Sequence, residues 1–407
     1  MERARFHTIW IAVIAIMMGM GGSGTGADQI YSISDFAVFS GSGLDTKDLH
    51  IGQNVSIYGL VGSNGNIETE RDALLFSGLR AGGSLNPGGI AGQKTSIGQS
   101  GTMTEAIVNG AFNFNGSVYG NVHAGTGVLL GASADLYTVG GMGGSIYSGG
   151  NVTFNASGPV VQGNVYTNGT VSGPGVINGT VSSLPIGLLK TFSLVTMPSA
   201  TVFSAGVTDV SSTGGANSNV VLVPGAYRDL NLGSNRTVTL SSGDYYFQSI
   251  TSSINLDLML DLSSGAPVNI YVTGNIDLGN NADVLVKTVG SGVFTDADLL
   301  GDHSSASLVY LETHGQFTLG ANSAWYGTVY ASADVAGAEK VELSIGQNAT
   351  VWGALYSLDQ IDLNAGAVIN RVSAYNLMSL PEPGTTVLLG TGGLLLLGWM
   401  RRRKLAD

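Results

Sequence analysis

The chain has 407 residues, of which 62 are glycine and none is cysteine, and its formal net charge is −12. The absence of cysteine excludes disulfide bonds, thiolate metal sites and cysteine nucleophiles. Between residues 28 and 380 there are ten lysines and arginines against 25 acidic residues. Nucleic-acid binding requires clustered basic side chains that neutralise phosphates, so we expect no nucleic-acid partner.

The first 27 residues have the layout of a secretory signal peptide. Arg3 and Arg5 precede an apolar run from Ile9 to Met20, and small residues close the segment at Thr25-Gly26-Ala27. This order of charged, apolar and small residues predicts export through the Sec machinery and a mature chain that starts near Asp28.

A nine-residue motif occurs once near each end of the body. Ile51–Gly59 reads IGQNVSIYG and Ile345–Gly353 reads IGQNATVWG, so five positions are identical. Alternating β-branched and aromatic residues bounded by Gly and Asn predict short strands. Asn and Gly are expected at the corners because both tolerate positive φ.

Short strands bury a face only when successive coils stack on one another. We therefore predict an all-β body that forms an irregular, β-helix-like β-solenoid, and the irregular repeat lengths leave a β-sandwich as the alternative. The residues expected to point inward are Val55, Ile57, Val165, Val329 and Val351.

The body divides at a turn-rich middle. We predict an N-terminal β-repeat region over residues 28–185, a linker over 186–218 and a β-helix-like region over 219–376. Within the linker, Ile186 to Phe192 is a candidate for a short helix that Pro198 would limit.

Residues 220–370 carry a series of aromatic β motifs, namely Val223–Tyr227, Gly243–Phe247, Asn269–Val272 and Ala324–Ala331. This part of the chain resembles the β-helical ice-binding proteins and related adhesins of bacteria. The resemblance implies a β-helical fold. Ice binding in that family depends on flat faces rich in threonine, and this sequence has no ordered Thr-x-Thr ladder.

Residues 377–407 combine three elements in a fixed order. Pro381-Glu382-Pro383 precedes an apolar run of 14 residues from Val387 to Met400, and Arg401, Arg402, Arg403 and Lys404 follow it directly. The run is shorter than the roughly 17–25 residues of a stable membrane-spanning helix, and the basic cluster holds the C-terminus in the cytoplasm. An ordinary C-terminal membrane anchor is the alternative.

This three-part tail resembles the PEP-CTERM sorting signal of bacterial surface proteins. The resemblance implies a short sorting helix, transient membrane anchoring, and recognition by an exosortase-like membrane protease. It also implies delivery to the cell envelope, the cell surface or the extracellular matrix.

Residues suited to catalysis or metal binding are sparse. No set of residues is assigned a catalytic role, and no metal site is expected with one weak exception. Asp296, Asp298 and Asp302 lie within seven positions and could offer oxygen ligands to Ca²⁺, although a solvated acidic loop is the favoured interpretation. His303 and His314 flank a strand-like segment and are expected to be ordinary turn residues.

Three classes of function remain open. The favoured one is a structural or adhesive protein of the cell surface or biofilm matrix, without enzymatic activity. The second is a polysaccharide- or ice-binding module that uses aromatic residues such as Trp325, Tyr326 and Trp352 on an exposed face. The third is a carbohydrate-active enzyme built on a solenoid.

Overall fold

The computed structural model describes residues 30–41, 48–87, 94–211, 219–332 and 341–372. In these residues the chain forms strands and three short 3-10 helices, η1 (Ile33–Asp35), η2 (Ala297–Leu299) and η3 (Ser304–Leu308). The predicted signal peptide, the Pro381–Pro383 motif, the predicted sorting helix and the predicted basic stop lie outside the described residues. No helix within the described part is long and apolar enough to cross a membrane.

The strands form three sheets, of 22, 14 and 5 strands. The first comprises β1 (Phe36–Ser40), β3 (Ser56–Tyr58), β4 (Leu60–Ser63), β6 (Leu74–Leu75), β7 (Leu79–Ala81), β9 (Thr95–Ile97), β10 (Thr104–Val108), β12 (Gly116–Ala124), β14 (Asp135–Val139), β15 (Met142–Gly143), β16 (Ile146–Ser148), β18 (Val160–Val161), β19 (Val165–Thr167), β21 (Val176–Ile177), β22 (Val181–Ser183), β25 (Gly225–Ala226), β28 (Gly243–Phe247), β31 (Val268–Val272), β35 (Val309–Thr313), β37 (Ala324–Ala331), β39 (Thr350–Ser357) and β41 (Val368–Asn370). The second comprises β2 (Leu49–Ile51), β5 (Ile67–Thr69), β8 (Leu85–Pro87), β11 (Ala111–Phe114), β13 (Gly127–Leu130), β17 (Val152–Phe154), β20 (Val171–Ser172), β23 (Val210–Ser211), β26 (Asp229–Leu232), β29 (Ser249–Ser252), β32 (Ile276–Leu278), β36 (Phe317–Leu319), β38 (Val341–Ile345) and β40 (Gln360–Leu363). The third comprises β24 (Asn219–Leu222), β27 (Arg236–Ser241), β30 (Leu256–Asp261), β33 (Asp283–Lys287) and β34 (Thr295–Asp296).

Strand pairing is parallel almost throughout. The antiparallel pairs among the described residues are β14–β15, β33–β34 and the isolated bridge between Gln99 and Thr102. The prediction of an all-β body is therefore confirmed. Parallel pairing from one coil to the next also agrees with the predicted stacking of coils, whereas the alternative β-sandwich is built from antiparallel sheets.

Each coil presents three faces. The first face contains β3, β6, β9, β14, β18, β21, β41 and the five-stranded sheet, and the second contains β1, β4, β7, β10, β16, β19, β22, β25, β28, β31 and β35. The 14-stranded sheet is the third face. The long strands β12, β37 and β39 turn from the first face to the second at Gly120, Gly327 and Gly353, whose φ angles are +139°, +126° and +154°.

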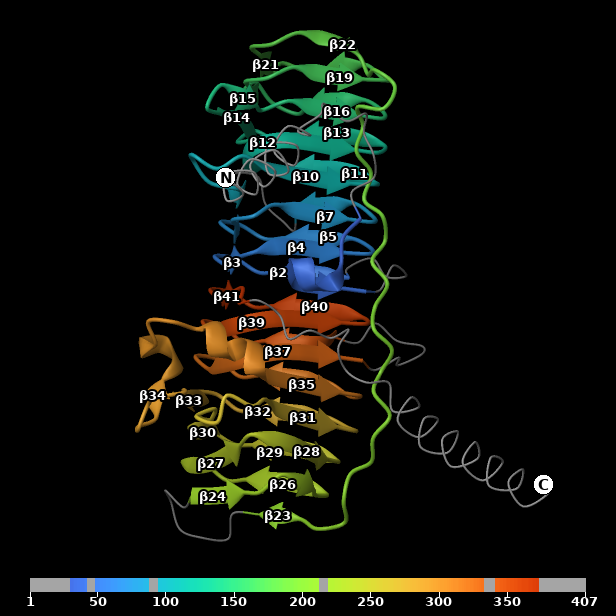
Figure 1. Ribbon diagram of the computed structural model, residues 1–407. Coiled ribbons are helices and arrows are strands. Elements are labelled where there is room, and N and C mark those ends of the chain that lie inside the picture. Colours follow the sequence, from blue (N-terminus) through green and yellow to red (C-terminus); the bar gives the residue numbers. More distant parts are fainter. Residues whose placement is uncertain (1–29, 42–47, 88–93, 212–218, 333–340, 373–407) are drawn as a thin grey trace, which may run out of the picture.

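The two halves of the chain meet in the middle of one stack (Figure 1). The N-terminal half rises from β1 to β22, the chain then returns along the outside, and the C-terminal half rises from β23 to β41. At the junction, which we call the seam, β39 pairs with β1, β40 with β2, and β41 with β3. One coil of the stack is thus shared, since β41 supplies its first face and β1 its second.

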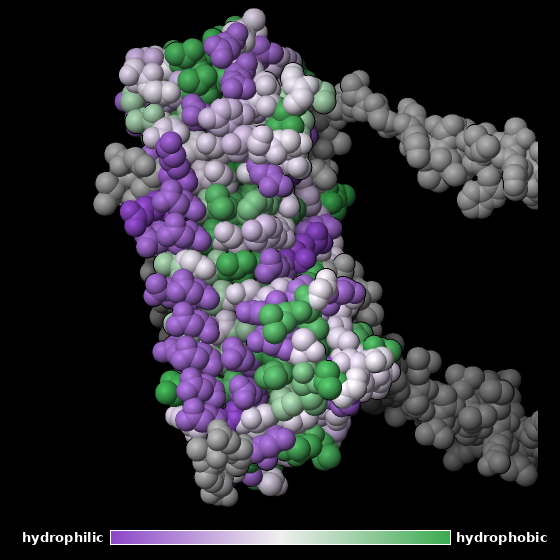
Figure 2. Space-filling view, turned by 90° about the vertical axis from the view of Figure 1, so that its left-hand side faces the viewer, coloured by the Kyte–Doolittle hydropathy of each residue, from purple (hydrophilic) through white to green (hydrophobic). Residues whose placement is uncertain are grey.

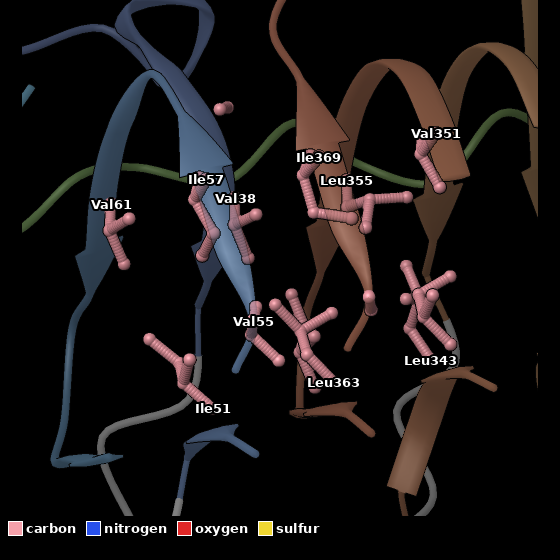
Figure 3. Packing of buried hydrophobic residues seen from close by; sticks show 14 of the residues in the cluster. Val38, Ile51, Val55, Ile57, Val61, Leu343, Val351, Leu355, Leu363 and Ile369 are labelled. Atoms are coloured by element: carbon pink, nitrogen blue, oxygen red, sulfur yellow. The ribbon is translucent and has the colours of Figure 1, made fainter. Parts of the chain in front are cut away.

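Inward-pointing aliphatic side chains fill the interior of the stack, including the seam. Figure 3 shows Val38, Ile57 and Val61 of the N-terminal half beside Leu355 and Ile369 of the C-terminal half. The five residues predicted to point inward are all buried in this core: Val55, Ile57, Val165, Val329 and Val351.

Asparagines with positive φ form a column at one corner. Asn235, Asn255, Asn281, Asn322 and Asn348 have φ between +53° and +57°. Their side-chain amides bond to one another along the stack, from Asn255 to Asn235, from Asn281 to Asn255 and from Asn348 to Asn322. The predicted asparagine corners are therefore present, and the hydrogen bonds between coils add a reason for asparagine rather than glycine.

Residues 185–209, which we call the strap, connect the top of the stack to its bottom along the second face (Figure 1). The short helix predicted over Ile186 to Phe192 is wrong, because the strap contains no helix. Its backbone is held instead by side chains of the stack. The amide of Asn109 bonds to both backbone groups of Phe192, and the amide of Asn64 does the same for Val195.

Candidate functional surfaces

The second face is buried beneath the strap. Its outward side chains include Phe39, Tyr330 and Tyr356, which form a second apolar cluster together with Phe192 and Val195 of the strap. On an uncovered solenoid these positions would face water. The strap therefore converts the second face into core, and it leaves the first and third faces as the open surfaces of the stack.

Charged groups lie beneath the strap as well. Glu312 is fully buried and accepts hydrogen bonds from Thr201 through its backbone N–H and its hydroxyl, both at 2.6 Å, and from the hydroxyl of Tyr310 at 3.0 Å. Burial raises the pKa of Glu312, but the hydrogen bonds from His314, Thr201 and Tyr310 outweigh it and leave that pKa below its ordinary value. The carboxylate therefore anchors the strap.

A second anchor lies nearer the top. The ammonium of Lys190 in the strap lies 2.5 Å from a carboxylate oxygen of Glu105, and the backbone N–H of Lys190 donates to Nδ1 of His123. Burial lowers the pKa of His123 to about 4, although Glu105 opposes the shift. Neutral His123 can accept the bond from the strap, so this group acts in attachment.

The third face presents one outward side chain from each strand in a continuous register. Its members run along all 14 strands: Ser211, Asn231, Thr251, Asp277, Thr318, Ser344, Asp362, His50, Glu68, Asn86, Asn113, Leu129, Thr153 and Ser172. All but Leu129 are polar. Neighbouring strands are about 4.8 Å apart, so the column offers closely and evenly spaced polar groups.

The first face carries stacked aromatic pairs. The rings of Tyr58 and Phe76 lie 4.2 Å apart at 10°, and those of Tyr119 and Tyr137 lie 5.0 Å apart at 20°. Tyr58 is 48% exposed, and the other three rings are partly exposed. This face is turned toward the viewer in Figure 2, where hydrophilic residues form a long band beside separate hydrophobic patches.

The aromatic residues proposed from the sequence as a binding surface are buried. Trp325 packs edge-on against Phe317 in the core, and Tyr326 shares a hydrogen bond with Ser305. Trp352 is 7% exposed because the imidazole of His303 stacks on its ring at 5.1 Å. Period-2 alternation sends one of two neighbours outward, but the insertion that contains η3 covers that outward side.

The insertion between β33 and β35 borders two hollows on the first face. One, of about 590 Å³, is lined by residues including Leu262, Leu300 and Leu308. The other, of about 390 Å³, is lined by residues including His303, Trp352 and Arg371. Asp302 and Ser304 border both hollows.

The three aspartates of the weak Ca²⁺ candidate lie in this insertion, and two of them, Asp296 and Asp302, accept hydrogen bonds from the local backbone. Asp296 accepts from the N–H of Asp298 at the start of η2, and Asp302 accepts from the N–H and hydroxyl of Ser304 before η3. The bonds from Ser304 lower the pKa of Asp302, whereas burial, followed by the charge of Asp296, raises that of Asp298. Within the described residues, no three acidic or histidine side chains are grouped to hold a metal ion.

Residues 197–372 match a family described as "Domain of unknown function (DUF7305)", a match that spans fewer than half of the residues. It covers the lower strap and the described part of the C-terminal half. No curated protein matches the chain significantly.

Two solved structures are distantly similar. One is an ice-binding protein from an Antarctic bacterium of the Flavobacteriaceae, with a TM-score of 0.24 and 12% identity over 85% of this chain and 98% of the other. The second is a possible adhesin C-terminal domain from Caldicellulosiruptor kronotskyensis, with a TM-score of 0.22 and 13% identity over 90% of this chain and 98% of the other.

Proposed function

We propose that this chain is an exported bacterial surface or matrix protein with a structural and adhesive role, built on a β-solenoid. The observation that carries the proposal is the third face, where one outward residue per strand forms an even polar column along 14 strands. Such a surface offers many equivalent weak contacts in a line. Multivalency turns weak contacts into firm attachment, whereas catalysis needs convergent groups.

The basic side chains support a non-enzymatic role, since several are already engaged in ion pairs on the stack. Lys190 binds Glu105, Arg228 binds Asp209, and Lys287 lies 3.0 Å from Asp261. These pairs connect neighbouring elements rather than meeting in a hollow. We therefore propose that the chain has no catalytic turnover and needs no cofactor.

The direct test is deletion of the gene, followed by measurement of matrix cohesion, surface attachment and aggregation of the cells. The proposal expects at least one of these to fall and to recover on complementation. If all three are unchanged while the purified chain depolymerises a glycan, the enzyme alternative replaces it.

A polysaccharide-binding module is the second candidate, favoured by the partly exposed aromatic pairs of the first face. Aromatic rings are common platforms for apolar contact in recognition sites. Retention of the purified chain in gels that contain matrix polysaccharide would test this candidate. Tyr58→Ser and Tyr119→Ser are expected to abolish retention, whereas Tyr166→Ser, on the second face, serves as the matched control. Equal retention of all variants would reject the aromatic pairs as a binding surface.

Sorting forms a separate part of the proposal. The tail, with Pro381-Glu382-Pro383 before an apolar run and a basic stop, supports recognition by an exosortase-like protease after Sec export. We expect a secreted form that lacks residues 1–27 and the segment after about Pro383, checked by intact-mass spectrometry. A secreted mass that still includes residues 387–407 would indicate a permanent C-terminal anchor.

A further inference from the structure

The upper end of the stack is an open coil. Among the described residues, β20, β21 and β22 have a partner strand only below them, namely β17, β18 and β19. The inward residues of this last coil, Val171, Ile177 and Val181, lie above the buried residues Val152, Val161 and Val165. Val181 is 53% exposed, and hydrophobic residues reach the surface at this end in Figure 2.

The lower end is open on two of its three faces. In the described part of the chain, β23 and β24 pair only with strands above them, namely β26 and β27. On the second face, Gly206 and Thr208 of the strap form backbone hydrogen bonds with Tyr227 and Arg228, directly after β25. The inward residues Val210 and Val220 are only partly buried. The upper end therefore has an unpaired strand on each of the three faces and the lower end has one on the first and third faces, and chain direction is the same at both ends.

Neither end carries the charges that usually protect an open edge. Native sheets block their edges with charged residues, proline or a covering element, because unpaired strands associate with other chains. Here residues 136–189 and 210–227 contain no Asp, Glu, Lys, Arg or His. The net charge of −12 disfavours contact between the flanks of two molecules, whereas at the lower end the nearest charges, Asp209 and Arg228, form an ion pair with each other.

The seam shows what such ends do when they meet. There β39, β40 and β41 pair in parallel with β1, β2 and β3, although more than 300 residues separate each pair in sequence. Apolar residues from both sides close into one core (Figure 3). This junction joins two stacks by the same parallel pairing that the unpaired strands of the upper and lower ends leave unused.

We infer that the two ends bind each other in successive copies of this chain, so that the molecule assembles head to tail. In this assembly β20 pairs with β23 and β21 with β24 of the next copy. Such an interface is heterologous, and repetition of it extends a rod rather than closing a dimer. The inference does not depend on export or sorting of the chain.

The experiment blocks one end at a time in the full-length chain, purified in detergent. Val181→Lys places a charge on the upper end, and Val220→Lys places one on the lower end. Val289→Lys is the control, because Val289 is 67% exposed and lies at neither end. Masses are measured by analytical ultracentrifugation and rod lengths by negative-stain electron microscopy, after circular dichroism has shown that each variant is folded.

We expect the wild-type and Val289→Lys chains to form rods in multiples of one stack length, and each end variant alone to be monomeric. An equimolar mixture of the two end variants should form dimers and nothing longer. The free lower end of Val181→Lys binds the free upper end of Val220→Lys, and both outer ends of the resulting dimer are blocked. If Val220→Lys does not fold, Val210→Lys in β23 replaces it. A monomeric wild-type chain, dimers of Val220→Lys alone, or no dimer in the mixture would overturn the proposal.

Discussion

Glu312 holds a negative charge in the interior of the protein, between the stack and the strap. An isolated buried carboxylate is strongly unfavourable, so its stability depends on the donors around it. Thr201 supplies two of these donors from the strap, and Tyr310 supplies a third from β35. Because the pKa of Glu312 is lowered by folding, the ionised form stabilises the fold above its ordinary pKa of 4.5.

We expect Glu312→Gln to lower the free energy of unfolding by about 1–3 kcal/mol at neutral pH, because an amide cannot accept all the bonds of a carboxylate. The stabilisation by the wild-type group is lost as pH falls through its lowered pKa. The difference between the two proteins should therefore shrink below pH 4.5, which denaturant unfolding at several pH values measures. Asp277→Asn on the exposed third face is the control, and an equal effect there would contradict the role of burial.

The asparagine corner gives a second prediction at the level of single residues. Asn322 has a φ of +53°, and its side chain accepts from that of Asn348. A β-branched residue in this conformation is strained, so Asn322→Val should destabilise the protein by about 1–2 kcal/mol or more. Asn322→Gly keeps the positive φ and should destabilise the protein less than Asn322→Val does. Thermal unfolding of the two variants measures the difference, and an equal loss of stability in both would show that only the hydrogen bond to Asn348 matters.

At the scale of elements, the strap shows most clearly what the sequence did not reveal. It lies almost entirely within the linker predicted over residues 186–218, which lacks strand alternation and ends in a Gly- and Ser-rich stretch beyond the strap. Its attachment depends on Asn64, Asn109 and Glu312, which lie far from it along the chain. Pairing of this kind follows from three-dimensional proximity and leaves no local pattern. By contrast, the asparagine corners and inward valines were predictable because both depend on neighbouring residues alone.

Phe192 is the side chain that fixes the strap most firmly. It is 2% exposed and lies among the rings of Tyr31, Phe36 and Phe39. Phe192→Ala is expected to lower the free energy needed to detach the strap from the stack by about 3–5 kcal/mol, because it removes a large buried ring. Hydrogen exchange should rise in residues 190–196 before it rises in the strands beneath. Val202→Ala, at a side chain that is 83% exposed, should leave exchange unchanged. A uniform rise across the stack would contradict a separable strap.

At the scale of the whole molecule, the seam determines the architecture. The two copies of the duplicated motif, at 51–59 and 345–353, lie on either side of the seam. Their first residues, Ile51 and Ile345, stack at one position in successive coils with Leu363 between them. The motif predicted similar local structure in two distant places. It could not show that the two places lie together, since repeats in a solenoid resemble one another whatever their separation. The sequence also did not show that the candidate binding aromatics are buried, because the insertion that covers Trp352 has no repeat signature.

His50 offers a pH probe of the seam. Its Nδ1 lies 2.6 Å from a carboxylate oxygen of Asp362 in the other half. The hydrogen bond to Asp362 raises the pKa of His50 against the effect of burial, and the charges of Asp362, Glu70 and Glu68 raise it further. A pKa raised by folding stabilises the protein below the ordinary value of 6.5, and the gain is lost as pH rises through the raised value.

We therefore expect the free energy of unfolding to fall as pH rises from about 6.5 through the raised pKa of His50. His50→Gln should remove this fall, because it lowers stability by about 1 kcal/mol at the acidic end. Chemical denaturation across this range provides the measurement. Asp362→Asn should have the same effect, and the double variant should add little to either one. Additive losses would show that the two groups do not act as a pair.

The shared coil also determines when the molecule becomes complete. Synthesis from the N-terminus makes β1 early and β41 near the end, so the lower side of β1, β2 and β3 stays unpaired until β39, β40 and β41 arrive. Contacts of such long sequence separation form slowly. During that delay the C-terminal half of a neighbouring nascent chain can occupy the same edge and exchange halves between two molecules. The period of greatest risk for this protein is therefore the interval before its last strand reaches its first.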